Sequence, residues 1–170
     1  MMNKKDFSIV CIGAGNVATH LAQALQQKGF HLSQIYSRTQ ESAQALAQTL
    51  GCAWTTCLEQ VDEHADLYIV SVKDAVLETV ISQLVHCNPD ALYLHTAGSM
   101  PMEVWKEKFK NYGVAYPMQT FSKQREVNFE EVPFFLEANS PENLSLLQEI
   151  TGSLSPKVYE ASSEQRRSEE

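Results

Sequence analysis

The sequence predicts an α/β fold in which a doubly wound, mostly parallel sheet carries helices on both of its faces. Short apolar runs typical of buried strands alternate with stretches whose apolar residues recur at helical spacing. The first apolar run, residues 9–12, leads directly into a glycine-rich turn, residues 13–18, and then into a helical pattern. Because right-handed crossovers join parallel strands, this order of elements indicates a doubly wound sheet.

In the first half of the chain, apolar positions and glycine stops set the boundaries of the elements. Val17, Leu21 and Leu25 lie on one face of a helix, and Gly29 ends it. Gly51 ends a second helix in the same way. We therefore expect, in order, a strand at 9–12, a helix around 17–25, a strand at 32–36, a helix at 41–50, a strand at 52–55, a helical connection at 58–61, a strand at 67–72 and a helix at 75–85.

The second half continues the alternation up to a polar end. Ser140 caps a helix that Gly152 follows, whereas residues 161–170 begin like a helix with serine caps but offer no apolar stripe. We divide the chain into one sheet domain, residues 1–160, and this polar tail. The tail is either frayed or the start of a helical domain that the 170 residues omit, and the sharp boundary favours the second. The expected elements are strands at 91–95, 113–116, 133–137 and 156–159, and helices at 102–110 and 141–151.

Composition excludes several classes of partner. The chain is 44% hydrophobic and 20% charged with a formal net charge of −8, so we expect it to bind neither nucleic acid nor an anionic membrane. No apolar run approaches the roughly 18 residues of a membrane span, and the first residues do not form a secretory signal. The cytoplasm is therefore the expected location. The four cysteines and five histidines show no metal-binding spacing, and we assign no metal.

The turn at residues 13–18 reads Gly-Ala-Gly-Asn-Val-Ala, a Gly-x-Gly-x-x-Ala fingerprint between a strand and a helix. Gly13 permits the tight turn, Gly15 lets the backbone approach a diphosphate, and Ala18 keeps the helix close to the strand. The open N–H groups and the positive dipole end of that helix also favour a diphosphate. This context predicts a Rossmann dinucleotide-binding domain. The turn residues expected to contact its cofactor are Gly13, Ala14, Gly15, Asn16 and Val17.

The end of the second strand distinguishes NADP from NAD. NAD-binding versions place an acidic residue about 20 positions past the glycines, where it binds the ribose 2′-hydroxyl. This chain has Ser37, Arg38 and Thr39 there, which offer hydrogen-bond donors and a positive charge. The alternative is a solvated loop arginine between two turn-forming residues. We predict that the three residues bind the 2′-phosphate of NADP.

These segments, together with Val70-Ser-Val-Lys-Asp74, resemble the NADP-binding domain of pyrroline-5-carboxylate reductase and are similar to the deazaflavin-dependent NADP reductases. A closer resemblance is to Rossmann-like oxidoreductases that join such a domain to a C-terminal helical domain of unknown function. His95-Thr-Ala-Gly-Ser99 and Tyr116-Pro-Met-Gln-Thr-Phe121 match two segments specific to that group. The resemblance spans about residues 7–167.

The chain departs from those relatives in two ways. Tyr116 replaces a histidine that is common at its position, and no helical domain follows Arg167. In the relatives that domain dimerises and supplies much of the substrate pocket. The resemblance therefore implies a homodimer for a full-length protein, and a substrate site that this chain does not complete alone.

Three further loops lie where ligands of a doubly wound sheet bind, beyond the carboxyl ends of the fourth, fifth and sixth expected strands. His95 is a candidate proton donor, because an unperturbed histidine titrates near pH 6.5. Lys73 is a candidate for orienting a substrate. The alternatives are a hydrogen-bonded structural histidine and a solvated turn lysine. The residues expected to contact the cofactor in these loops are Ser71, Val72, Lys73, Thr96, Ala97 and Gly98.

Three more polar residues have two interpretations each. Ser99 either faces the site or caps the next helix. Gln119 and Thr120 either face substrate or satisfy the backbone of their own loop.

We predict an NADP-dependent oxidoreductase domain that transfers a hydride to or from a small carbonyl or imine compound, with the protein orienting the cofactor. The alternative is a regulatory domain that senses NAD(P) without turnover, which the lack of a convincing acid–base pair favours. A third interpretation is a catalytic subunit that needs a missing remainder.

Overall fold

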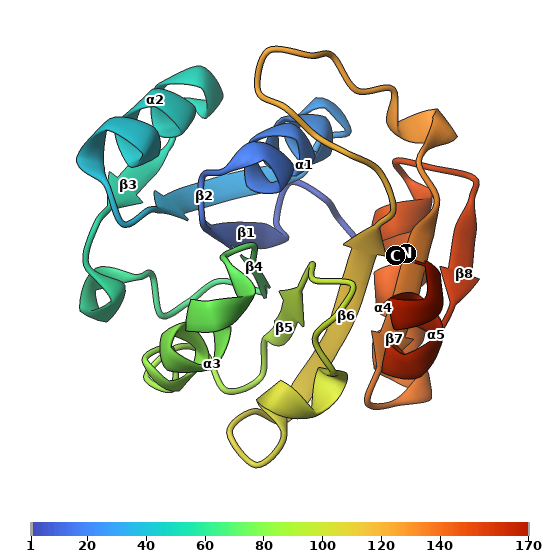
Figure 1. Ribbon diagram of the computed structural model, residues 1–170. Coiled ribbons are helices and arrows are strands. Elements are labelled where there is room, and N and C mark those ends of the chain that lie inside the picture. The colour runs from blue at the N-terminus through green and yellow to red at the C-terminus, as the bar shows by residue number, and fades with distance from the viewer. Residues whose placement is uncertain (1, 170) are drawn as a thin grey trace.

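Strands and helices alternate along most of the computed structural model, which describes residues 2–169. The strands are β1 (Ser8–Ile12), β2 (His31–Tyr36), β3 (Ala53–Thr55), β4 (Leu67–Val70), β5 (Leu92–His95), β6 (Asn111–Pro117), β7 (Phe134–Ala138) and β8 (Val158–Glu160). They form one sheet in the order β3-β2-β1-β4-β5-β6-β7-β8 (Figure 1). Every neighbouring pair is parallel except β6 with β7. The predicted doubly wound, mostly parallel sheet is therefore confirmed.

Helices cover both faces of this sheet. The helical elements are α1 (Asn16–Gln27), α2 (Gln40–Leu50), α3 (Asp74–Ser82), α4 (Pro141–Gly152), α5 (Ser163–Glu169) and the short 3₁₀ turns η1 (Leu58–Gln60), η2 (Met102–Trp105) and η3 (Phe129–Glu131). One apolar core joins α1, α2 and α4 to the sheet, with Leu21, Leu46 and Leu147 buried in it. A second core, on the opposite face, joins α3 and η2, with Leu77 and Trp105 buried.

The prediction of a helix at residues 102–110 is wrong. Only the 3₁₀ turn η2 forms, because Glu107 takes a left-handed conformation (φ 72°) that a right-handed helix does not permit. The indole of Trp105 instead turns toward β6 and donates a hydrogen bond of 3.1 Å to the Gly113 carbonyl. Elsewhere the expected elements agree with the structure to within a few residues. Ser140 caps α4, as predicted, by accepting the Asn143 N–H at 3.1 Å.

The carboxyl ends of the central strands lie in one row. The register places Ile12 of β1 opposite both Tyr36 of β2 and Val70 of β4, and Val70 opposite His95 of β5. The four loops that follow these strands therefore share one edge of the sheet. The strand order reverses between β1 and β4, which is where ligands of doubly wound sheets bind.

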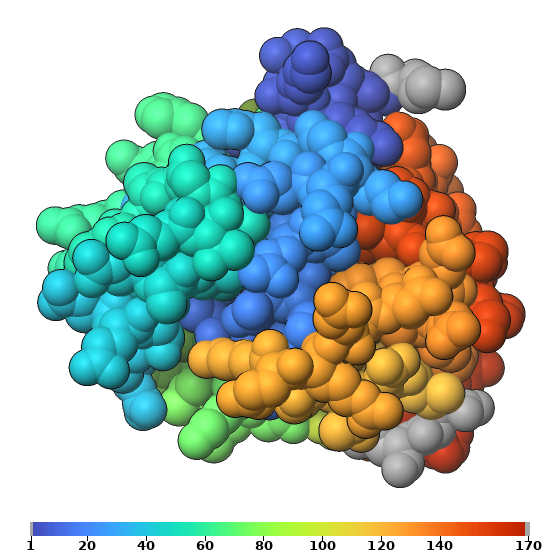
Figure 2. Space-filling model, turned by 90° about the horizontal axis from the view of Figure 1, so that it is seen from above, coloured from blue at the N-terminus to red at the C-terminus, as the bar shows by residue number. Residues whose placement is uncertain are grey.

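A long connection between β6 and η3 crosses α1. Figure 2 shows it (orange) lying against that helix (blue). The Asn16 side chain donates a hydrogen bond of 3.1 Å to the Phe121 carbonyl, and a ring nitrogen of His20 contacts the Ser122 carbonyl. These contacts fix the connection beside the N-terminal half of α1.

Candidate cofactor-binding site

The two glycines of the first turn have different structural surroundings. Gly13 has a φ of 118°, and a Cβ built on it would lie 2.2 Å from the Ser71 carbonyl oxygen. Its N–H donates to the Tyr36 carbonyl at 2.7 Å. Gly15 has an ordinary φ of −79°, and nothing lies within 4 Å of a Cβ built there. The fold therefore requires Gly13, whereas Gly15 keeps a surface open.

The N-terminus of α1 faces this open surface. Gly15 is the N-cap residue, so no side chain caps the helix, and the first turn carries no acidic residue. The first N–H groups of a helix have no partner within it, and they carry the positive end of the helix dipole. The Asn16 side chain is directed to Phe121, which leaves the backbone of the first turn as the donor surface. Ala14 is buried in the core beneath it.

The loop after β2 exposes a guanidinium and a hydroxyl. The Ser37 hydroxyl is nearly buried and accepts the Thr39 N–H at 3.4 Å, which closes the turn. Arg38 is exposed, and Thr39 is the N-cap residue of α2 without a side-chain cap bond. Burial raises the pKa of the neighbouring Tyr36 phenol, and the charge of Arg38 opposes that rise. The cationic group therefore lies beside the end of β2.

The loops after β4 and β5 are joined by side-chain hydrogen bonds. Thr96 Oγ1 donates to Ser71 Oγ at 3.0 Å, and Ser99 Oγ donates to Asp74 Oδ2 at 2.6 Å. Ser99 therefore bonds α3 and does not cap the next helical turn, whose N-cap residue is Pro101. Together these bonds fix the two loops relative to each other.

His95 is fully buried and both of its ring nitrogens are occupied. The Ala97 N–H donates to Nδ1 at 3.1 Å, which places the ring proton on Nε2, 3.2 Å from the Pro101 carbonyl that accepts it. Burial lowers the pKa of His95 to about 4, so the ring is neutral near pH 7. This geometry favours the structural interpretation of His95 over that of a proton donor, because its one proton already bonds the protein.

The other sequence candidates lie on the surface. Lys73 is the exposed N-cap residue of α3, and Gln119 and Thr120 are exposed at the start of the connection that crosses α1. Val72 is half-buried and packs against the core on the α3 face. Gln119 bonds its own loop through its N–H, which donates to the Pro117 carbonyl at 3.0 Å.

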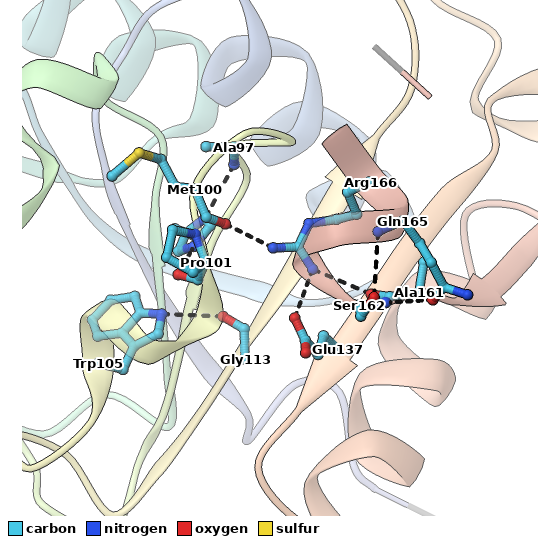
Figure 3. A network of polar contacts seen from close by, with 11 residues as sticks. Ala97, Met100, Pro101, Trp105, Gly113, Glu137, Ala161, Ser162, Gln165 and Arg166 are labelled. Atoms are coloured by element: carbon cyan, nitrogen blue, oxygen red, sulfur yellow. Dashed lines mark hydrogen bonds and ion pairs between the residues drawn. The ribbon is translucent and has the colours of Figure 1, made fainter. Parts of the chain in front are cut away.

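Sequence reasoning missed Arg166, which is fully buried although it belongs to the polar tail. Figure 3 shows its guanidinium between Glu137 of β7 and the Met100 carbonyl, with N–O distances of 2.7 Å to each. A signal was present in the sequence. Ser162 and Gln165 form a capping box, in which each side chain accepts the N–H of the other residue. This box starts α5 at Ser163, three residues before Arg166.

A cavity of about 520 Å³ is lined by Thr39, at the end of the loop after β2, and by Gln40, Glu41 and Gln44 of α2. A cavity of about 500 Å³ lies between the C-terminal half of α1 and residues 123–130, away from the glycine turn. The open surface at the strand ends is better suited to an extended dinucleotide, which lies across a sheet edge. In residues 2–169 no cluster of three potential ligands suits a metal ion, and no helix is long and apolar enough to cross a bilayer.

Comparison with known proteins agrees with this geometry. The model of a family described as coenzyme F420-dependent NADP oxidoreductases matches residues 8–97. No protein of curated function matches the chain in sequence. A crystal structure of a proposed NADP oxidoreductase from Bacteroides fragilis is 53% identical, with a TM-score of 0.94 over 98% of this chain and 64% of that one. The chain thus spans less than two thirds of that relative.

Two more distant structures share the fold. The pyrroline-5-carboxylate reductase of Coxiella burnetii is 18% identical, with a TM-score of 0.76 over 94% of this chain and 60% of that one. An imine reductase from Myxococcus stipitatus in complex with NADP⁺ is 14% identical, with a TM-score of 0.76 over 95% and 57% of the two chains.

Proposed function

The chain belongs to the coenzyme F420-dependent NADP oxidoreductase family, and we propose that it binds NADP(H) along the carboxyl edge of β1, β2, β4 and β5 for hydride transfer to a small carbonyl or imine compound. The observation that carries the proposal is the contrast at the glycine turn. Gly13 is locked against Ser71, whereas Gly15 leaves an open surface in front of uncapped helix N–H groups.

The diphosphate and the 2′-phosphate have separate candidate partners. The backbone N–H groups at the start of α1 fit a diphosphate, because the N-cap residue, Gly15, has no side chain to cap them or to block a ligand. Arg38 and Thr39 fit the 2′-phosphate, because their charged and hydroxyl groups are exposed at the end of β2. None of the three residues that directly follow that strand, residues 37–39, is a carboxylate, which favours NADP over NAD.

The loops after β4 and β5 are proposed to orient the nicotinamide half. When bound, the nicotinamide supplies or accepts the hydride. Ser71 Oγ already accepts a hydrogen bond from Thr96 Oγ1, so the hydroxyl proton of Ser71 remains available to donate to a ligand oxygen or nitrogen. The backbone of Thr96, Ala97 and Gly98 shapes the same surface. These groups hold and orient a ligand rather than exchange protons with solvent.

The proposed substrate class is a small carbonyl or imine compound. Two relatives of the same fold are named as reductases of C=N compounds, and the Bacteroides fragilis relative is named only as an oxidoreductase. Neither Lys73 nor His95 completes an acid–base pair within residues 2–169. The proton that accompanies hydride transfer is therefore proposed to come from solvent or from substrate.

The first experiment is calorimetric titration of the chain with NADPH, NADP⁺ and NADH, with Arg38→Ala and Lys28→Ala compared in parallel. Lys28 ends α1 away from the phosphate residues and serves as the charge-matched control. We expect NADPH to bind at least about tenfold more tightly than NADH, and Arg38→Ala to abolish that preference while Lys28→Ala keeps it. Equal affinities for NADPH and NADH would contradict the NADP assignment.

A second candidate function is sensing of NAD(P) without turnover. It is favoured by His95, whose occupied ring nitrogens remove that residue as a proton donor to a ligand. The test is NADPH oxidation against imines, 2-oxo acids and oxidised coenzyme F420. Tight NADPH binding without oxidation of NADPH across the panel would support the sensor for this chain.

A further inference from the structure

The guanidinium of Arg166 joins three parts of the fold that lie far apart in the sequence. One terminal nitrogen donates to Glu137 Oε1 at 2.7 Å and to the Ala161 carbonyl at 3.2 Å, and the other donates to the Met100 carbonyl at 2.7 Å. The side chain is fully buried, while the Glu137 side chain is 20% exposed. Figure 3 shows the guanidinium between β7 and the loop after β5.

The loop that Arg166 reaches is the one proposed to orient the nicotinamide. Met100, whose carbonyl bonds Arg166, directly precedes Pro101. The Pro101 carbonyl accepts a hydrogen bond from His95 Nε2, and His95 Nδ1 accepts one from the Ala97 N–H. A connected series of bonds therefore leads from Glu137 through Arg166 and the loop backbone to Ala97. Together with the bond from Thr96 to Ser71, this series holds the backbone of residues 96–98.

Only an arginine suits this position. Its planar fork carries donors that reach a carboxylate on one side and a carbonyl on the other, which the single ammonium of a lysine does not span. Within residues 2–169 the buried Nε of Arg166 has no hydrogen-bond partner, so the position of the guanidinium does not satisfy all of its donors. It is placed where its two terminal nitrogens link β7 to Met100.

We propose that Arg166 is a positioning residue for the cofactor: it holds the 96–101 loop in the shape that receives the nicotinamide half, and so makes α5 part of the site. This inference rests on the proposed function. It adds that α5, which follows the edge strand β8 at the opposite end of the sheet from β2 and β3, controls one half of the dinucleotide and not the other.

The experiment compares two ligands on the full chain. Adenosine 2′,5′-bisphosphate carries the adenosine and the 2′-phosphate but no nicotinamide. We expect Arg166→Met to weaken NADPH binding about tenfold while changing the affinity for adenosine 2′,5′-bisphosphate less than about twofold. Arg167→Met, on the exposed side of the same helix, should leave both affinities unchanged. Arg166→Lys, which keeps the charge beside Glu137 but not the link to Met100, should show the same selective loss if Arg166→Met does not fold.

Hydrogen exchange supplies a readout without a ligand. The Ala97 amide should exchange at least about tenfold faster in either Arg166 variant than in the wild type, with the amides of β1 unchanged. An equal loss of affinity for both ligands, or unchanged NADPH affinity with a protected Ala97 amide, would overturn the positioning role. Wild-type protein that binds neither nucleotide would overturn the proposed function, whereas the exchange of Ala97 would still test the hold of Arg166 on the loop.

Discussion

The loops after β1 and β2 differ from the loops after β4 and β5 in what their polar groups bond to. On the first side the start of α1 is uncapped, Thr39 makes no side-chain cap bond and Arg38 is exposed. On the second side Thr96 bonds Ser71 and Ser99 bonds Asp74. One side presents unpaired donors to an incoming anion, and the other presents a backbone surface fixed by internal bonds.

This difference separates affinity from orientation. Uncapped N–H groups and a guanidinium gain hydrogen bonds only when a phosphate arrives, so that side should supply most of the binding free energy. On the second side Thr96, Ser99 and Asp74 already bond within the protein, so these side chains gain little from a ligand. Their internal bonds instead restrict the shape of the loop, which is what orienting a nicotinamide requires. Gly13→Ala changes the contact between the two sides, and each of the other predictions below changes one side and leaves the other in place.

The largest effect is expected from Gly13→Ala. A methyl group would overlap the Ser71 carbonyl and force a φ of 118° on an alanine, so we expect a loss of about 4 kcal/mol or more of unfolding free energy. Gly15→Ala should cost less than about 1 kcal/mol, because its Cβ enters open space, yet it should weaken NADPH binding. Urea denaturation and calorimetric titration measure both effects. A stable Gly13→Ala protein would contradict the close approach of the two loops.

Arg166→Met should lower the free energy of unfolding by about 3–5 kcal/mol, because it leaves Glu137 and the Met100 carbonyl without their partner. The double variant Arg166→Met with Glu137→Gln should recover part of that loss, since no unpaired charge remains. Chemical denaturation of the single and double variants checks this. If the two losses simply add, the ion pair contributes nothing beyond packing.

His95 predicts a pH dependence on the second side. Its folded pKa of about 4 lies below that of an unfolded histidine, about 6.5, so the unfolded state binds the proton first. The contribution of His95 to the free energy of unfolding is thus fully present above pH 6.5 and falls by about 1.4 kcal/mol per pH unit as the pH drops toward 4. Asp74 and Arg166 are the charged groups that act on His95, in opposite directions. Denaturation at several pH values should give a flatter profile for His95→Gln than for the wild type, and identical slopes would contradict a buried neutral ring.

The smallest effect is expected from Thr96→Val, which removes the hydrogen bond to Ser71 while keeping the shape of the side chain. We expect a loss of about 1 kcal/mol of stability and a modest rise in the Kd for NADPH. The Kd for adenosine 2′,5′-bisphosphate should not change. A matching rise for the second ligand would show that the two sides of the edge are not independent.

The fold was predictable because the strand–turn–helix order and the helix stops are local signals. Apolar runs identify the strands, and Ser140 and Gly51 mark helix ends that the structure confirms. The helix expected at 102–110 failed because Glu107 takes a left-handed conformation that no residue type announces in advance. Apolar spacing alone did not exclude a helix there.

Much of the candidate site was predictable for the same reason, since the fold fixes which loops follow β1, β2, β4 and β5. The environment of His95 was not, because its burial and its two partners depend on how the loop to Pro101 folds back. Arg166 was missed because its partners lie 29 and 66 residues away and its neighbours are polar. A buried charge in a polar segment has no signature in hydrophobic periodicity.

The measurement that tests the account most directly is amide chemical-shift mapping of the full chain during titration with NADPH. We predict saturable shifts at residues 13–17 and 37–39, and at 71–73 and 96–98, whereas adenosine 2′,5′-bisphosphate should shift the first two groups only. Shifts confined to the cavity lined by residues 123–130 and the C-terminal half of α1, or no shifts at all, would contradict a cofactor site at the carboxyl edge of the sheet.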